Sequence, residues 1–220
     1  MNKLSNTVQY SHPCPLCSNN NISFFHSDKN RSYMQCPNCS LVFVPKSFHL
    51  TSEDEKAVYD LHKNDVFDEG YRRFLSRITR PLSEQLTQGA RGLDFGCGPG
   101  PALSKMMEEN GFDMSLYDPY YDNNQEMLNQ RWDFITATEV VEHLSSPGKE
   151  FRRLFTILKD CGTLGIMTKL VIDREAFARW HYIHDQTHIC FYSRETFKYL
   201  AAEFNTELEF IGNDVILMRK

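Results

Sequence analysis

The chain has 220 residues, of which 41% are hydrophobic and 24% charged, as expected for one α/β domain with a small appendage. Its formal net charge of −5 gives it no general attraction for the phosphate backbone of a nucleic acid. No stretch approaches the ~18 apolar residues of a membrane-spanning helix, and residues 1–13 are polar. We therefore expect a cytoplasmic protein with no membrane partner.

Four of the seven cysteines form two C-x2-C pairs with eighteen residues between them. Each pair suits a tight turn whose two thiolates face one ion, and two such turns complete a tetrahedral Zn²⁺ site. Short strands are predicted at 22–25, 32–35 and 41–44, so the region resembles a zinc ribbon. The predicted metal ligands are Cys14, Cys17, Cys36 and Cys39. A redox C-x-x-C motif and a disulfide pair are the alternatives.

Zinc ribbons of this kind are mostly closed structural sites, so we expect the metal to have no catalytic role. The ribbon is predicted to contact a nucleic acid, to contact a protein partner, or only to cover the larger domain that follows it. Lys29 and Arg31 are its few basic residues, which makes nucleic acid the least favoured of these partners.

Two helices are predicted between the ribbon and the main sheet. The first starts at a capping-box pair, Ser52 and Glu55, and ends near His62, and the second spans 68–86 with an interruption at Pro81. Aromatic and aliphatic residues recur at helical spacing, which is typical of core packing. The alternative is that four side chains fold over a cofactor. These are Tyr59, His62, Asn64 and Tyr71.

The stretch 92–100, Gly-Leu-Asp-Phe-Gly-Cys-Gly-Pro-Gly, joins a short apolar strand to a helix predicted over 101–110. Glycines let backbone N–H groups approach a ligand, and a helix N-terminus adds unpaired donors. The third glycine is Gly100 and not residue 101, so the G-x-G-x-x-G dinucleotide fingerprint is not matched. Together with Asp94, which we expect to accept hydrogen bonds from loop amides, this stretch resembles the first motif of class I S-adenosylmethionine-dependent methyltransferases. A loop that merely turns the chain is the alternative.

The resemblance covers about residues 55–220. Residues 114–118 are predicted as the second strand, and Asp118 lies 22 residues past Gly96, where its carboxylate can accept from both ribose hydroxyls of the cofactor. A turn-forming Asp before Pro119 is the alternative. Residues 122–131 are too short and polar for the family's next helix and third strand, so no residue is assigned to the adenine edge.

The fourth strand is predicted at 132–136, and the segment 138–144, Thr-Glu-Val-Val-Glu-His-Leu, resembles the family's post-strand motif. The resemblance implies that Thr138 and Glu139 contact the methionine end of the cofactor, while His143 is either catalytic or structural. The complete set of expected cofactor-binding residues is Asp94, Phe95, Gly96, Cys97, Gly98, Gly100, Asp118, Pro119, Thr138 and Glu139.

The remaining elements complete the sheet. They are a helix from Ser146-Pro147 to near Lys159, a strand at 164–168, a helix capped by Ser193 that ends at Phe204, and a hairpin of 207–211 with 215–219. The hairpin separates a methyltransferase sheet from a plain dinucleotide-binding sheet. The predicted fold class is therefore α/β: a Rossmann-like class I methyltransferase sheet with a C-terminal antiparallel hairpin, plus a small N-terminal zinc ribbon.

Residues 180–192 contain four aromatics, three histidines and an acid, a mixture that suits a pocket wall. Methyl transfer to oxygen or nitrogen requires removal of a proton, and a histidine near neutral pKa beside a carboxylate is suited to that task. Asp185 and His188 are the predicted pair. The alternative is that they only shape the loop.

Three parts are expected: a zinc-ribbon module at 1–48, a helical linker and cofactor cover at 49–88, and a methyltransferase domain at 89–220. The predicted activity is methyl transfer from S-adenosylmethionine to a small-molecule acceptor whose reacting atom is unassigned. An RNA methyltransferase that uses the ribbon, and a cofactor-binding module without turnover, are the two alternatives.

Overall fold

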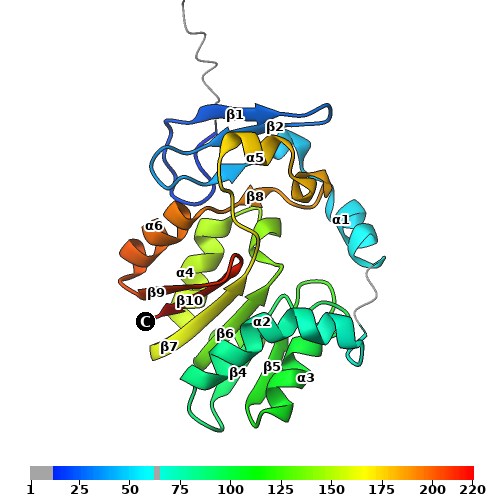
Figure 1. The fold of residues 1–220 in the computed structure, drawn as a ribbon, viewed down its shortest axis with the longest axis vertical. Helices are drawn as coiled ribbons and strands as arrows, with labels where there is room; N and C mark the ends of the chain where they lie inside the picture. The colour runs from blue at the N-terminus through cyan, green and yellow to red at the C-terminus, as the bar shows by residue number, and fades with distance from the viewer. Residues whose placement is uncertain (1–11, 62–64) are drawn as a thin grey trace, which may run out of the picture.

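The computed structural model of the protein describes residues 12–61 and 65–220. It contains a sheet of six strands and a smaller sheet of four (Figure 1). Within these described ranges, no helix combines the length and the apolar character that crossing a membrane requires. His62 and Asn64, two of the predicted cofactor covers, lie outside the described residues.

The large sheet consists of β4 (Arg91–Phe95), β5 (Asp113–Tyr117), β6 (Trp132–Thr138), β7 (Leu158–Met167), β9 (Glu207–Ile211) and β10 (Val215–Arg219). Its strand order is β5-β4-β6-β7-β10-β9. Strands β4 to β7 are parallel, and β10 runs antiparallel to both β7 and β9. The predicted α/β fold with a C-terminal antiparallel hairpin is confirmed.

The sheet ends at β5 within the described residues. Beyond β5 the chain forms a short 3₁₀ helix, Gln125–Asn129, and then enters β6. This agrees with the expectation that residues 122–131 have no room for another helix and strand.

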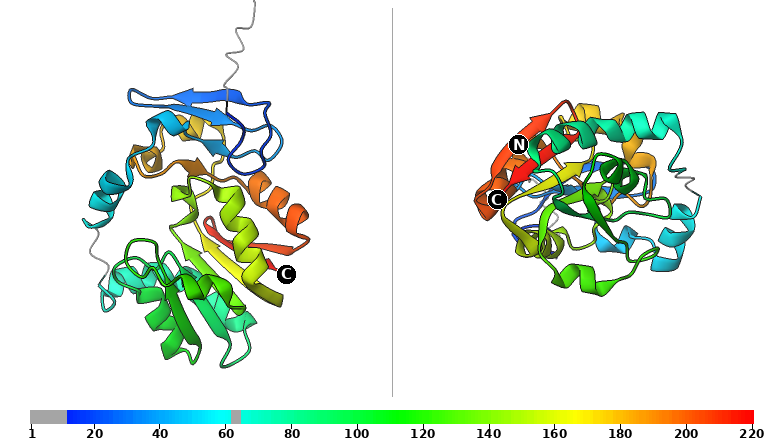
Figure 2. Two further views of the ribbon diagram at one scale, coloured as in Figure 1. Left: turned by 180° about the vertical axis from the view of Figure 1, so that it is seen from behind. Right: turned by 90° about the horizontal axis from the view of Figure 1, so that it is seen from below.

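The helices are α1 (Ser52–Tyr59), α2 (Glu69–Gln85), α3 (Ala102–Glu109), α4 (Pro147–Ile157), α5 (Arg174–Ala178) and α6 (Arg194–Phe204). Helices α2 and α3 cover one face of the large sheet, and α4 and α6 cover the other (Figures 1 and 2). Successive side chains of a strand point to opposite faces of the sheet, so both faces of β10 are covered. Val215 and Leu217 pack with α2 and α3, whereas Ile216 and Met218 pack with α4 and α6.

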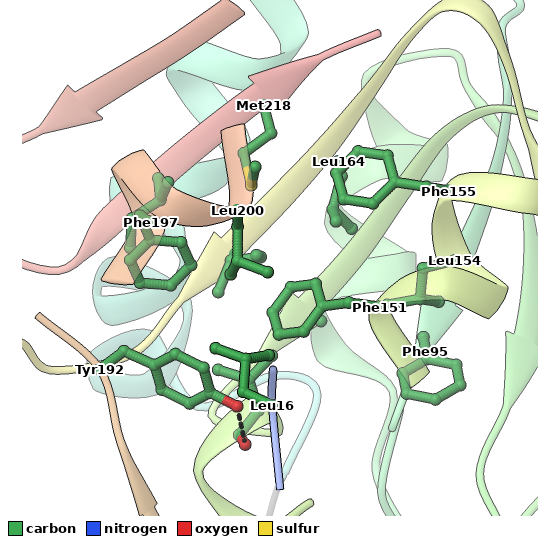
Figure 3. Close-up of a cluster of buried hydrophobic side chains, with 14 of the residues drawn as sticks. Leu16, Phe95, Phe151, Leu154, Phe155, Leu164, Tyr192, Phe197, Leu200 and Met218 are labelled. Carbon is green, nitrogen blue, oxygen red and sulfur yellow. Dashed lines mark hydrogen bonds between the residues drawn. The ribbon is translucent and has the colours of Figure 1, made fainter. Parts of the chain in front are cut away.

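Figure 3 shows the hydrophobic cluster on the second of these faces, where side chains of α4 and α6 pack against the sheet. The hydroxyl group of Tyr192 donates to the carbonyl of Val141 at 2.9 Å and closes one side of it. Leu16, from between Cys14 and Cys17, is only 4% exposed and belongs to the same cluster. The region of the four cysteines, residues 12–48, which we call the cysteine-rich region, therefore shares a core with the large sheet.

The predicted interruption of α2 at Pro81 is wrong, because the helix runs unbroken from Glu69 to Gln85. A proline inside a helix costs about 3 kcal/mol. Leu75, Ile78 and Leu82 of this helix are buried against the sheet, and each such burial contributes about 1.5–3 kcal/mol. Packing therefore outweighs the local preference.

The predicted capping box of α1 is also wrong by one residue. The N-cap is Thr51, whose side chain accepts from the backbone N–H of Asp54 at 3.2 Å. Glu55, the expected partner of Ser52, instead accepts hydrogen bonds from two tyrosine hydroxyls, those of Tyr59 and Tyr120. A tertiary contact has replaced the local one.

The small sheet consists of β1 (Ser23–Ser27), β2 (Ser32–Gln35), β3 (Val42–Phe43) and β8 (Cys190–Phe191). Its first three strands lie where short strands are predicted, but β8 comes from the C-terminal part of the chain and pairs antiparallel with β3. The guanidinium of Arg31 donates to the carbonyls of Ile183, Asp185 and Gln186 at 2.6–3.0 Å. These contacts bind the segment before β8 to the cysteine-rich region.

Candidate active site

A cavity of about 660 Å³ lies where the parallel strands β4, β5 and β6 end. This is the edge of an open α/β sheet at which ligands bind. Nearly every predicted site residue outside the cysteine cluster lines it. They are Asp94, Phe95, Gly96, Cys97, Gly98, Gly100, Asp118, Pro119, Thr138, Glu139, His143, Asp185 and His188.

The glycine loop has the shape that its sequence predicts. Gly96 and Gly98 have φ angles of +82° and +64°, a region that side chains disfavour. A Cβ atom on Gly96 would also lie 2.4 Å from a methyl carbon of Val140. Both requirements exclude any larger residue at Gly96.

Asp118 holds this loop. One of its carboxylate oxygens accepts from the backbone N–H of Gly98 at 3.0 Å, and the other accepts from the N–H groups of Tyr120 and Tyr121 at 2.8 and 3.1 Å. Because a carboxylate has about four acceptor positions, Asp118 retains capacity for a ligand hydroxyl.

The expectation that Asp94 binds loop amides is wrong. Its carboxylate accepts from the hydroxyls of Ser104 and Thr136, both at 2.9 Å. The end of β4 places this carboxylate between Ser104 of α3 and Thr136 of β6. Burial, opposed by these two hydrogen bonds, raises the pKa of Asp94 to about 6.

Two buried polar atoms at the end of β6 have no hydrogen-bond partner among the described residues. They are Oγ1 of Thr138 and Oε1 of Glu139. Glu139 has a φ angle of +53°, and burial, together with the nearby Glu142, raises its pKa to about 8. Both side chains line the cavity, so a ligand with hydrogen-bond donors fits here.

The far end of the cavity brings together His143, Asp185 and His188. Nδ1 of His188 lies 2.8 Å from the carbonyl oxygen of Tyr182, and Nε2 lies 3.8 Å from a carboxylate oxygen of Asp185. Burial, reinforced by the neighbouring His143, lowers the pKa of His188 to about 4, so its ring is neutral at physiological pH. The orienting partner of the His188 ring is therefore a backbone carbonyl, while Asp185 accepts from Thr187.

The sequence of residues 67–209 matches the family model of the methyltransferase domain. The chain belongs to this methyltransferase family. The match spans well over half of the chain and includes the glycine loop, Asp118 and the segment after β6. The predicted S-adenosylmethionine-dependent methyltransferase is thus confirmed at the level of family, fold and enzyme class, and the acceptor is a separate question.

Solved structures support the same fold. A SAM-dependent methyltransferase from Archaeoglobus fulgidus aligns with a TM-score of 0.52 and 18% identity, over 70% of this chain and 98% of that one. The 1,6-didemethyltoxoflavin-N1-methyltransferase of Burkholderia thailandensis, solved with its substrate and S-adenosylhomocysteine, aligns with a TM-score of 0.50 and 14% identity, over 90% and 98%. No curated protein sequence matches the chain.

Helix α1 of the methyltransferase covers the cavity through hydrogen bonds to Tyr120 and Tyr121, and the sequence did not predict these bonds. Glu55 of α1 accepts from Tyr59 of the same helix at 2.9 Å and from Tyr120 across the cavity at 2.7 Å. Asp60 accepts from Tyr121 at 2.7 Å. Tyr59 and Tyr71 line the cavity, as in the cofactor-cover alternative, while Leu75 and Ile78 are buried in the core.

The four predicted zinc ligands lie together near the start of α4, where the N–H of Gly148 donates to the carbonyl of Pro15. The sulfur atoms of Cys14 and Cys39 are 3.5 Å apart, as are those of Cys17 and Cys36, and all four lie within 4.8 Å of one another. Four thiolates bound to one ion at about 2.3 Å would be separated by roughly 3.8 Å. The cluster therefore fits a single tetrahedral ion.

Proposed function

We propose that this methyltransferase transfers a methyl group from S-adenosylmethionine to a small acceptor that is neutral or positively charged. The observation that carries this proposal is the charge and size of the cavity. A volume of about 660 Å³ is typical of small-molecule sites and must hold both the cofactor and the acceptor.

The acidic lining supports the exclusion of polyanionic acceptors. Among the described lining residues, Arg153 is the sole lysine or arginine, and Glu150 holds it at 2.6 Å. The acidic side chains of the lining are Glu55, Asp94, Asp118, Glu139, Glu150 and Asp185. Phosphate backbones require basic contacts, so this composition disfavours the RNA alternative and also disfavours an aromatic acid.

We assign the cofactor to the half of the cavity formed by the glycine loop. The carboxylate of Asp118 would accept from the ribose hydroxyls, and the unpartnered atoms of Thr138 and Glu139 would accept from the ammonium group of the methionine part. S-adenosylmethionine supplies a methyl group already activated by its sulfonium. The protein then has to align the acceptor and receive its proton.

The acceptor is assigned to the other half, beside His143, Asp185 and His188. A carbonyl oxygen can only accept, so the hydrogen bond to Tyr182 places the proton of the neutral His188 ring on Nδ1 and leaves a lone pair on Nε2. His188 and Asp185 are therefore two groups at this end that can receive a proton from an oxygen or nitrogen nucleophile. We propose a structural Zn²⁺ on the four cysteines, with no catalytic step.

The proposal is tested by calorimetric binding of S-adenosylmethionine, followed by release of S-adenosylhomocysteine from pools of alcohols, phenols, amines and RNA. Asp118→Asn should weaken cofactor binding by about 2 kcal/mol, or roughly thirtyfold, because it removes a charged acceptor. Asp122→Asn, on the same turn but outside the cavity, should bind as the wild type does. Turnover of RNA alone would contradict the assignment of a small acceptor.

A further inference from the structure

We infer that the far end of the cavity is a binding site for a divalent metal ion, held by Glu142, His143 and His188. One ligand atom of each side chain lies within 4.8 Å of the other two. Metal–nitrogen bonds of about 2.1 Å place ligand atoms around one ion roughly 3 to 4 Å apart, so small side-chain rotations close the set. The inference deepens the proposed function and rests on it for the position of the acceptor.

Glu142 is the observation that requires an explanation. Its side chain is fully buried at 0% exposure. Oε1 accepts from the hydroxyl of Tyr182, but Oε2 has no hydrogen-bond partner among the described residues. A buried carboxylate oxygen without a donor is costly, and a bound cation would offset that cost.

The two histidines have the orientation found in metal sites. Nδ1 of His143 lies 3.1 Å from the carbonyl of Thr187, and Nδ1 of His188 lies 2.8 Å from the carbonyl of Tyr182. The bond of His188 places the proton of its neutral ring on Nδ1 and a lone pair on Nε2, and the bond of His143 fixes the orientation of its ring. Metal-binding histidines are oriented in this way by an acceptor behind the ring.

Asp185 adds a negative charge beside this group. Its carboxylate oxygen lies 3.8 Å from Nε2 of His188. A carboxylate at this distance favours a cation at the proposed site.

The backbone fixes these groups in place. Glu142 and His143 belong to the 3₁₀ helix Val141–His143 that follows β6. The N–H of Ile189 donates to the carbonyl of Glu142 at 2.9 Å, which ties the segment of His188 to that helix. The geometry is therefore held by two elements that are far apart in sequence and joined by a backbone hydrogen bond.

Two imidazoles and one carboxylate suit a divalent first-row ion and leave coordination positions open towards the cavity. An acceptor hydroxyl bound there loses its proton more readily. The O–H proton would pass to the carboxylate of Asp185, the oxygen would bond to the methyl carbon, and the electrons of the broken C–S bond would stay on sulfur. The acceptor class is therefore an alcohol or a phenol, and Nε2 of His188 binds metal instead of a proton.

The test uses full-length protein loaded with one equivalent of Zn²⁺, which the thiolates take up, and then titrated with Mn²⁺. Free Mn²⁺ is followed by its EPR signal. Mn²⁺ prefers nitrogen and oxygen ligands to thiolates, so it reports on the second site alone. The wild type should bind one Mn²⁺ per chain.

Two variants and a control make this result specific. His143→Ala, at the half-buried ligand, and Glu142→Gln, which keeps the side-chain shape, should each weaken Mn²⁺ binding by at least about tenfold. His184→Ala, on the exposed surface of the same segment as His188, should bind Mn²⁺ as the wild type does. Thermal unfolding of each variant shows that it is folded.

Absence of Mn²⁺ binding to the wild type overturns the inference and means that a proton or water bridges Asp185 and His188. Equal binding by the wild type and both ligand variants also overturns it, because the ion then sits elsewhere. Binding of S-adenosylmethionine is measured separately without Mn²⁺. Failure of the metal site is therefore distinguishable from failure of the proposed function.

Discussion

Two buried aspartates at neighbouring strand ends, Asp94 and Asp118, show how differently the same side chain is used. Asp118 is held by three backbone N–H groups, whereas Asp94 is held by two hydroxyls. Burial raises the pKa of Asp94 to about 6, above its value in an unfolded chain. The folded state therefore binds this proton more tightly. The resulting stabilisation is complete below about pH 4 and is lost as the pH rises through about 6.

The variant Asp94→Asn should remove this pH dependence. Relative to the variant, the wild type should lose about 1 kcal/mol of unfolding free energy between pH 5 and pH 7.5. Urea unfolding of the cofactor-free protein at several pH values measures the difference. Glu126→Gln, at an exposed carboxylate, should keep a constant difference from the wild type. Parallel curves for Asp94→Asn and the wild type would contradict the assignment.

At this scale, the sequence predicts positions in the site better than it predicts partners. The offset between Gly96 and Asp118 correctly indicates a carboxylate at the cavity, because consecutive parallel strands end at one edge. The partners of Asp94 depend on how α3 and β6 pack, and local sequence does not contain that information. Nothing in the sequence marks Glu142 as a buried residue of the site, since a glutamate between valine and histidine is ordinarily exposed.

At the scale of elements, α1 is unusual because none of its residues is buried. Across the cavity, the hydroxyls of Tyr120 and Tyr121 donate to Glu55 and Asp60, and the ring of Tyr59 contacts the rings of Tyr120 and His143. A helix held by a few hydrogen bonds and ring contacts, with no buried residue, opens at low cost, since local stability follows buried contacts. We therefore expect α1 to open for ligand entry and to close over the cofactor.

Tyr120→Phe should weaken S-adenosylmethionine binding by about 1 kcal/mol, or about fivefold, because it removes one hydrogen bond of the closed cover but keeps the ring. Tyr121→Phe is the matched control, since its partner Asp60 is half exposed and also paired with Lys56. Its effect should be smaller. Calorimetry measures both affinities, and an unchanged affinity in Tyr120→Phe would show that α1 does not cover the cofactor.

Most elements of the large sheet are predictable because their patterns are local. The hairpin, the helix capped by Ser193 and the strands β4, β5 and β6 lie close to their predicted ranges, whereas β7 begins at Leu158, six residues before the predicted start at 164. The exceptions come from contacts between distant residues. Pro81 is tolerated because α2 packs on the sheet, and the two-residue strand β8 becomes a strand only because β3 lies beside it.

On the scale of the whole molecule, the cysteine-rich region is built into the enzyme. The carbonyl of Pro15, between the first two cysteines, accepts from the N–H of Gly148 at the start of α4. A Cβ atom on Gly148 would lie 2.1 Å from the carbonyl oxygen of Leu16, so the two backbones touch. Through β3, β8 and Arg31, the same region holds the segment that carries Asp185 and His188.

Removal of zinc should therefore loosen the acceptor end of the site. Cys14, Cys36 and Cys39 are buried in the shared core, so the proposed Zn²⁺ would contribute folding free energy by holding their thiolates together. Hydrogen exchange should show amides of residues 183–191 losing protection by at least about tenfold in chelator-treated protein, while β4 and β6 keep theirs. Re-addition of Zn²⁺ should restore protection.

Cys36→Ser should behave like the chelated protein, whereas Cys161→Ser, at an exposed cysteine, should exchange like the wild type. Full protection of residues 183–191 in Cys36→Ser would mean that the small sheet holds its shape without the metal. β8 and Arg31 link the region of the four cysteines to Asp185 and His188. These contacts require residues 12–48 to be folded. The exchange measurement therefore decides whether the ribbon supports the acceptor site.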